Sequence, residues 1–279
     1  MNESLHPYYC GHCNCSLKEL DSDIDKTCSV EPCPFCDTLL SESLQRQKIS
    51  RIVHSPKILF QKASQLPKIT FDIDKIDSAL NFLTPDQKIC LTGIHTQKLV
   101  ERLCVRAQLP CRYGGLDSNV LLIDGANSSD LYQCVDFAQQ YGLDAKKILS
   151  GIISCRAFTV YQLANLIVNE LNNVIKQYGA KIIILTHLLH YFTNDPYLNT
   201  NEMQRILKTV VQSLKALNNC LVVISLGSPT AFDGMLLQLF SKTIIIKQNH
   251  NTLSIHIDDL GKTQSILIDD NALTIIPQH

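Results

Sequence analysis

The chain has 279 residues, of which 45% are hydrophobic, and it carries a formal net charge of −1. These values predict a globular protein with one large domain, or one domain plus a small module, and give no global basic field of the kind that attracts nucleic acid. No apolar run reaches the ~18 residues of a membrane span. The polar start MNESLHPYY is not typical of a signal peptide. We therefore expect a cytoplasmic protein without a membrane partner.

Cysteine is concentrated at the start of the chain, where six of the twelve cysteines fall within the first 36 residues. Four of them form two Cys-x2-Cys pairs with 19 residues between the pairs: Cys10, Cys13, Cys33 and Cys36. Two such pairs predict a structural Zn²⁺, because four thiolates complete a closed tetrahedron without a position for water. Residues 1–40 are thus predicted to form a zinc ribbon, and the role of Cys15 and Cys28 stays open.

The rest of the chain divides into a polar segment and an α/β core. Residues 41–68 contain SPK and LPK, which predict a short helix and a linker before a core at 69–279. Amphipathic stretches predict helices at 97–109, 129–143, 159–179 and 199–217. Continuous Val, Ile and Leu runs predict strands at 88–93, 120–125, 181–187 and 221–227. Because such runs need burial on both faces, the sheet is expected to be mostly parallel and flanked by helices.

Four shorter apolar runs follow, at 243–248, 253–259, 264–270 and 272–277, and turns rich in Asn, Asp and Gly separate them. This pattern predicts an antiparallel edge at the C-terminal end of the sheet. The cysteines scattered through the core are interpreted as small buried hydrophobic residues.

Ligands of parallel α/β sheets bind beyond the carboxyl ends of the strands, so the residues there are the first candidates for chemistry. The stretch TGIHTQKL (92–99) stands where a phosphate loop would be, yet it has one glycine, Gly93, and its Lys98 falls in the predicted helix. A phosphate loop needs several glycines, a lysine for charge and a Ser or Thr for magnesium. These residues define a degenerate nucleotide site: Gly93, Thr96, Gln97, Lys98, Asp124 and Thr186.

Several segments in the same order and spacing resemble the RecA/RadA recombinases, in their archaeal and eukaryotic branch. The resemblance runs from about residue 69 to 259 through FDIDKIDSALN (71–81), AQLP (107–110), AQQYGLDAKKIL (138–149), CRAFTVYQLANLI (155–167) and KIIILTHLLHYF (181–192). It implies a RecA-like core.

The chain also departs from this family where the family carries out its chemistry. The resemblance implies that the phosphate-loop Lys and Thr and the catalytic Glu are absent. It places Thr186 where the family has its magnesium Asp, and Leu226-Gly227 where it has a sensor Asn-Gln. The two DNA-contacting loops would fall near 192–202 and 227–234, which contain no Lys or Arg. We therefore expect a pseudo-ATPase, not an enzyme, with ATP unlikely as a cofactor.

Upstream of the core, LFQKAS places Phe60 and Ala63 in a Phe-x-x-Ala pattern similar to the one by which archaeal recombinases dock onto a neighbouring subunit; simple linker packing is the alternative.

The sequence favours an accessory or mediator factor of DNA recombination and repair, with a RadA-type recombinase or another protein as partner and DNA as a second candidate. Two alternatives stay open: a divergent nucleotide-binding ATPase and an interaction adaptor unrelated to DNA.

Overall fold

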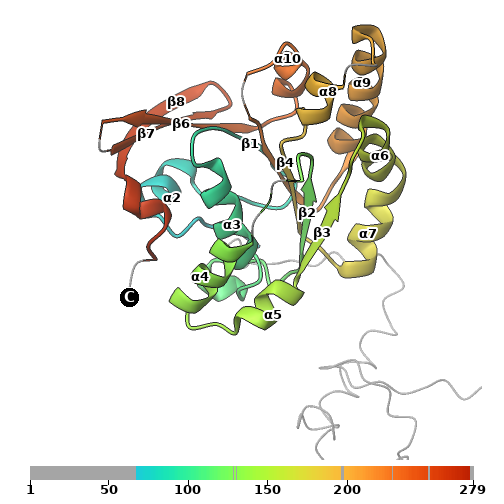
Figure 1. The fold of residues 1–279 in the computed structure, drawn as a ribbon. Helices are drawn as coiled ribbons and strands as arrows, with labels where there is room; N and C mark the ends of the chain where they lie inside the picture. The colour runs from blue at the N-terminus through green and yellow to red at the C-terminus, as the bar shows by residue number, and fades with distance from the viewer. Residues whose placement is uncertain are drawn as a thin grey trace, which may run out of the picture. The chain divides into compact units, whose positions relative to one another are not determined.

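The computed structural model describes residues 67–127, 129, 131–195, 198–227, 229–250 and 252–276. The predicted zinc ribbon and the Phe60–Ala63 pattern lie outside these residues. The described part is an α/β fold built on one sheet of eight strands in the order β3-β2-β4-β5-β1-β6-β7-β8 (Figure 1). The first six strands in that order, from β3 to β6, run parallel to one another, whereas β7 pairs antiparallel with both β6 and β8. The predicted fold class is confirmed for the core.

The strands of the sheet are β1 (Lys88–Gly93), β2 (Val120–Asp124), β3 (Ile152–Arg156), β4 (Ile182–Thr186), β5 (Leu221–Ser225), β6 (Lys242–Asn249), β7 (Thr252–Asp259) and β8 (Lys262–Asp269). The helices of eight or more residues are α3 (Thr96–Arg106), α4 (Tyr132–Gln140), α7 (Leu171–Tyr178) and α9 (Thr200–Ala216). Shorter helices are α2 (Asp74–Leu80), α5 (Ala145–Ser150), α6 (Val160–Asn165), α8 (His190–Asn194) and α10 (Asp233–Leu237), with short η2 (Cys111–Tyr113), η3 (Leu166–Glu170) and η4 (Asp270–Leu273) turns.

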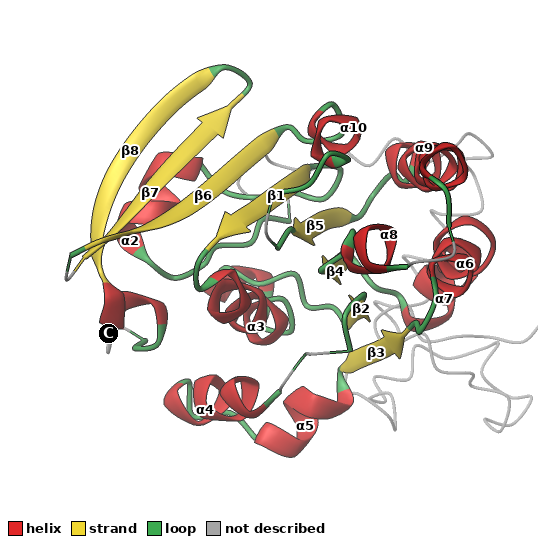
Figure 2. Ribbon diagram, turned by 45° about the horizontal axis from the view of Figure 1, so that its top comes forward, coloured by secondary structure: helices red, strands yellow, loops and turns green. Residues whose placement is uncertain are grey.

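Helices cover both faces of the sheet, as the continuous apolar strands require. Alternate residues of β4 show this directly: Ile182 and Ile184 face the core under α3 and α4, while Ile183 and Leu185 face the core under α6, α7 and α9. In Figure 2 the first group of helices lies on one side of the strands and the second group on the other. Among the described residues no helix is long and apolar enough to cross a membrane.

Three details of the core differ from the sequence prediction. The predicted helix 159–179 is interrupted, because the π-helical turn η3 separates α6 from α7. The edge strand β3 was not predicted, since its burial alternates and it gives no continuous apolar run. The buried-cysteine interpretation holds for four of the six core cysteines, but Cys111 is exposed and Cys155 half-buried.

The predicted last strand, 272–277, is wrong. The chain instead forms the short 3-10 turn η4 and then leaves the sheet. Its backbone is satisfied by side chains in place of a neighbouring strand: Arg102 donates to the carbonyls of Ala272 and Ile275, and Gln140 bonds both Thr274 O and Ile276 N. Buried backbone polar groups must find partners, and here arginine and glutamine supply them.

Candidate functional site

Polar side chains form a row across the carboxyl edge of the sheet. Asp124, Thr186 and Ser225 are the last residues of β2, β4 and β5, and strand register places Asp124 beside Thr186 and Thr186 beside Ser225. All three are almost completely buried. Because the next strand along, β1, leads directly into the loop before α3, this row stands where an open α/β fold binds ligands.

Asp124 uses both carboxylate oxygens within the protein. One accepts the backbone N–H of Ala126 at 3.1 Å and the Thr186 hydroxyl at 3.2 Å, and the other accepts the N–H of Ser129 at 2.6 Å. Burial acts to raise the pKa of Asp124, but these hydrogen bonds outweigh it and lower the pKa below its ordinary value of 3.8. Asp124 is therefore a carboxylate that fixes the turn after β2.

The loop between β1 and α3 is held against the backbone of β6. Gly93 has φ +99°, and a Cβ placed on it would lie 2.0 Å from the carbonyl oxygen of Ile246. The next residue, Ile94, donates its N–H to the same oxygen at 3.1 Å. His95 follows with φ 55° and starts α3 without a side-chain cap. This loop has a single glycine and lies against a neighbouring strand, so it forms no ring of N–H groups around a phosphate.

The first turn of α3 is also engaged in internal contacts. The hydroxyls of Thr96 and Ser225 lie 3.1 Å apart at hydrogen-bonding distance. Gln97 donates to Glu101 at 2.8 Å. Lys98 points to Asp270 of η4, with 3.8 Å between Nζ and Oδ1.

The structure therefore brings the residues of the predicted site together in pairs and not around one centre. Thr186 contacts Asp124, and Thr96 contacts Ser225, whereas Gln97 and Lys98 turn away toward α3 and η4. Sequence reasoning missed Ser225 and Asp270. Ser225 closes the apolar run LVVIS and would have been found if β5 had been ended there, two residues earlier than predicted.

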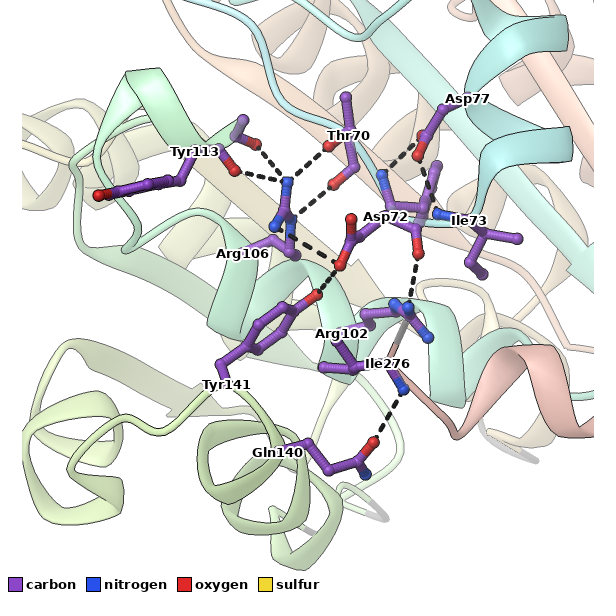
Figure 3. A network of polar contacts seen from close by, with 12 residues as sticks. Thr70, Asp72, Ile73, Asp77, Arg102, Arg106, Tyr113, Gln140, Tyr141 and Ile276 are labelled. Atoms are coloured by element: carbon purple, nitrogen blue, oxygen red, sulfur yellow. Dashed lines mark hydrogen bonds and ion pairs between the residues drawn. The ribbon is translucent and has the colours of Figure 1, made fainter. Parts of the chain in front are cut away.

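Two arginines anchor α3 to both ends of the described chain (Figure 3). Arg102 is fully buried and donates to the carbonyls of Asp72 and of the segment around η4. Arg106, one turn later, donates to Thr70 and to the Tyr113 carbonyl. This arrangement could not be predicted from the sequence, because buried arginines look like ordinary charged positions of an amphipathic helix.

The network continues to α4 through Asp72. The Tyr141 hydroxyl donates to Asp72 Oδ2 at 2.8 Å, and Arg106 Nη1 lies 3.8 Å from the same oxygen. Burial, helped by that hydrogen bond, raises the pKa of Tyr141 to about 12, so the phenol stays protonated and remains a donor at neutral pH. These contacts fix the axis of α3 and with it the position of the loop that precedes the helix.

A cavity of about 750 Å³ lies on the other side of the sheet, between α8, α9 and the segment after β5. It includes described parts of both segments at which the resemblance places DNA-contacting loops. Phe192, Met203 and Phe232 are apolar lining residues, and none of its described lining residues is Lys, Arg, Asp or Glu. His187 enters it with φ 51° and a buried Nδ1 that has no hydrogen-bond partner. Across the described residues, no group of three or more His, Cys, Asp or Glu is placed to hold a metal ion.

A parallel sheet with helices on both faces and polar residues at its carboxyl edge defines the open α/β class. The family model that matches this chain is Rad51, over residues 92–226. The chain is 24% identical over 178 residues to the "DNA repair protein RAD51 homolog" of Solanum lycopersicum, covering 56% of this chain and 51% of the relative. It is 27% identical over 161 residues to the "DNA repair and recombination protein RadA" of Cenarchaeum symbiosum (strain A), covering 56% and 40%.

A shorter match, 36% identical over 70 residues, relates the chain to the "Meiotic recombination protein DMC1 homolog A" of Oryza sativa subsp. japonica, covering 25% of this chain and 20% of the relative. The chain spans about half or less of the length of these curated relatives. The fold and these matches support the RecA/RadA-type superfamily for this chain, in agreement with the resemblance seen in the sequence.

Proposed function

We propose that this chain is a catalytically inactive RecA/RadA-type paralogue that acts as an accessory or mediator factor in DNA recombination and repair. It would work by binding a RadA-type recombinase, DNA or both, and not by hydrolysing ATP. One observation carries the proposal. The strand-end side chains that an ATPase of this kind would turn toward nucleotide and magnesium are here bonded to one another.

The details support this interpretation. Thr186 supplies a hydroxyl where the family has a magnesium-binding carboxylate, and that hydroxyl donates to Asp124. Lys98 lies in the first turn of α3, with its ammonium toward Asp270 and not toward the strand ends. The segment matched by the family model begins at Thr92, so the loop lies inside the matched region. A site that binds ATP would have to break these contacts and supply a phosphate cradle that this loop lacks.

The N-terminal residues supply the second part of the proposal. The four cysteines of the predicted zinc ribbon would hold a structural Zn²⁺, which would provide much of the folding energy of so small a module. The Phe60-x-x-Ala63 pattern would dock onto a neighbouring recombinase subunit by adding a strand and filling a pocket with the aromatic ring.

The test is affinity capture of a RadA-type recombinase by the full-length, zinc-loaded chain, with single-stranded DNA binding measured on the same material. We expect the recombinase to be captured and Phe60→Glu to reduce the capture. The control is Phe82→Glu, at an exposed position of the α/β domain, which should leave capture unchanged. DNA binding, if present, should weaken with salt. A chain that captures no recombinase and binds no DNA would refute an accessory role. Capture unaffected by Phe60→Glu would refute the docking step alone.

A further inference from the structure

One side of α9 carries a row of positively charged side chains. Arg205, Lys208 and Lys215 are exposed and are spaced three and seven residues apart, so they lie along the same side of the helix. Within the described part of the chain none of the three has an acidic partner. This charge is local, because the whole chain has a formal net charge of −1.

The acidic residues of α9 and α10 are occupied elsewhere. Glu202 of α9 accepts the hydroxyl of Tyr161 in α6 at 2.5 Å. Asp233 of α10 accepts the hydroxyl of Thr230 at 2.5 Å. Neither carboxylate forms an ion pair with Arg205, Lys208 or Lys215, so the three cations remain available to a ligand.

A depression of about 320 Å³ lies beside this row, where α9 meets α10, and is called the α9–α10 groove below. Its lining combines two amides, two cations and one thioether, from Asn201, Gln204, Arg205, Lys208 and Met235. Amide side chains can bond a peptide backbone, and methionine adapts to apolar side chains of different shapes. Arginine and lysine bind carboxylates through charge-assisted hydrogen bonds.

The lining favours a peptide over nucleic acid. Single-stranded nucleic acid is held by stacking on aromatic rings, and no aromatic residue lines the groove. The groove also offers only two cations, which would neutralise few of the phosphates on which nucleic-acid affinity depends. An apolar position next to two cations matches an acidic segment that carries one apolar side chain.

We infer that the α9–α10 groove binds an acidic peptide segment of a partner protein, with its carboxylates on Arg205 and Lys208 and an apolar side chain over Met235. The inference rests on the proposed function, for which it names the kind of partner. None of the carboxyl-edge residues lines the groove, whereas Asn201 belongs to one of the segments that the resemblance assigns to DNA and Met235 directly follows the other.

The test uses fluorescence polarisation with a labelled short peptide in which Asp and Glu flank one leucine, added to the full-length, zinc-loaded chain. We expect saturable binding that weakens as salt is raised. The double variant R205E and K208E should raise the Kd by about thirtyfold or more, because like charges would then face each other. Met235→Gln, which keeps the length of the side chain but removes its apolar character, should also weaken binding.

The matched control is the double variant K146E and K147E, which makes the same charge change at exposed positions of α5, on the opposite face of the sheet. It should bind the peptide like the unmodified chain, and circular dichroism should show that all variants are folded. Peptide binding that is absent, or unchanged by R205E and K208E, overturns the inference. If the chain binds a labelled oligothymidylate and not the peptide, and the R205E and K208E variant loses this binding, the inference is overturned as well. The groove would then be a nucleic-acid site.

Recombinase capture on the same proteins separates the two proposals. Capture of the recombinase by the unmodified chain without any peptide binding overturns the inference about the groove and leaves the proposed function standing. Peptide binding that depends on the groove, without capture of a recombinase or binding of DNA, supports the groove and counts against the proposed function.

Discussion

Replacing Arg102 by methionine should destabilise the protein more than any other single change on α3. The guanidinium is fully buried and donates to Asp72 O at 2.7 Å, Ala272 O at 3.1 Å, Ile275 O at 3.2 Å and Leu273 O at 3.5 Å. Burial lowers its pKa, yet arginine remains charged at neutral pH. Methionine retains the aliphatic stem but leaves these carbonyls without their donor.

The magnitude follows from the carbonyls that lose a partner. Each unsatisfied buried acceptor costs about 1–3 kcal/mol, and relief from burying a charge offsets part of the sum. We therefore expect the free energy of unfolding to fall by about 3–5 kcal/mol. With a urea m-value of about 2 kcal/mol/M, the unfolding midpoint should drop by roughly 1.5–2.5 M.

Urea unfolding followed by circular dichroism measures this directly. Arg112→Met is the matched control, because Arg112 is exposed and only lies over the Tyr113 ring at 4.8 Å, so its effect should stay within about 0.5 kcal/mol. A midpoint for Arg102→Met within about 0.5 M of the unmodified chain would refute the idea that this arginine holds α3 to the two ends of the core.

Three further predictions concern the loop, the carboxyl edge and the cysteines. Gly93→Ala should lower the free energy of unfolding by about 3 kcal/mol or more, because its Cβ would meet Ile246 O at φ +99°. Gly142→Ala, at φ +66° in open space, should cost about 1 kcal/mol, and equal thermal shifts would contradict the steric argument.

Because the pKa of Asp124 is lowered, its contribution to stability is present above pH 3.8 and is lost as the pH falls through the folded-state pKa. The free energy of unfolding of Asp124→Asn should thus differ most from that of the unmodified chain near neutral pH and converge with it in acid. A constant difference in urea unfolding across this pH range would argue against the prediction. Elemental analysis should find about one zinc per chain, and a metal-free sample would rule out the zinc ribbon. The zinc should be lost when serine replaces the paired cysteines Cys10, Cys13, Cys33 and Cys36.

The core strands could be predicted from the sequence because β2, β4 and β5 are buried on both faces and must be continuously apolar. The edge strand β3 could not be found in this way, since one of its sides is exposed. The segment after β8 was misassigned because Ala-Leu-Thr-Ile-Ile has a strand-like composition. Its conformation is determined by Arg102 and Gln140, which are far away in the sequence.

The site was predictable in its residue types but not in its contacts. The single glycine of the loop and the threonine at the end of β4 can be recognised from strand ends alone. The contact of Lys98 with Asp270 depends on how β8 returns to α3, and the bond between Thr96 and Ser225 depends on the register of β1 and β5. Neither is encoded in local sequence.

Equilibrium binding of magnesium–ATP to the full-length, zinc-loaded chain tests the central claim most directly. The contacts among Asp124, Thr186, Thr96 and Ser225 predict that isothermal titration calorimetry will show no saturable heat. Saturable ATP binding that disappears in Lys98→Ala, and persists in the exposed-lysine control Lys176→Ala, would contradict the account and identify the carboxyl edge as a working nucleotide site.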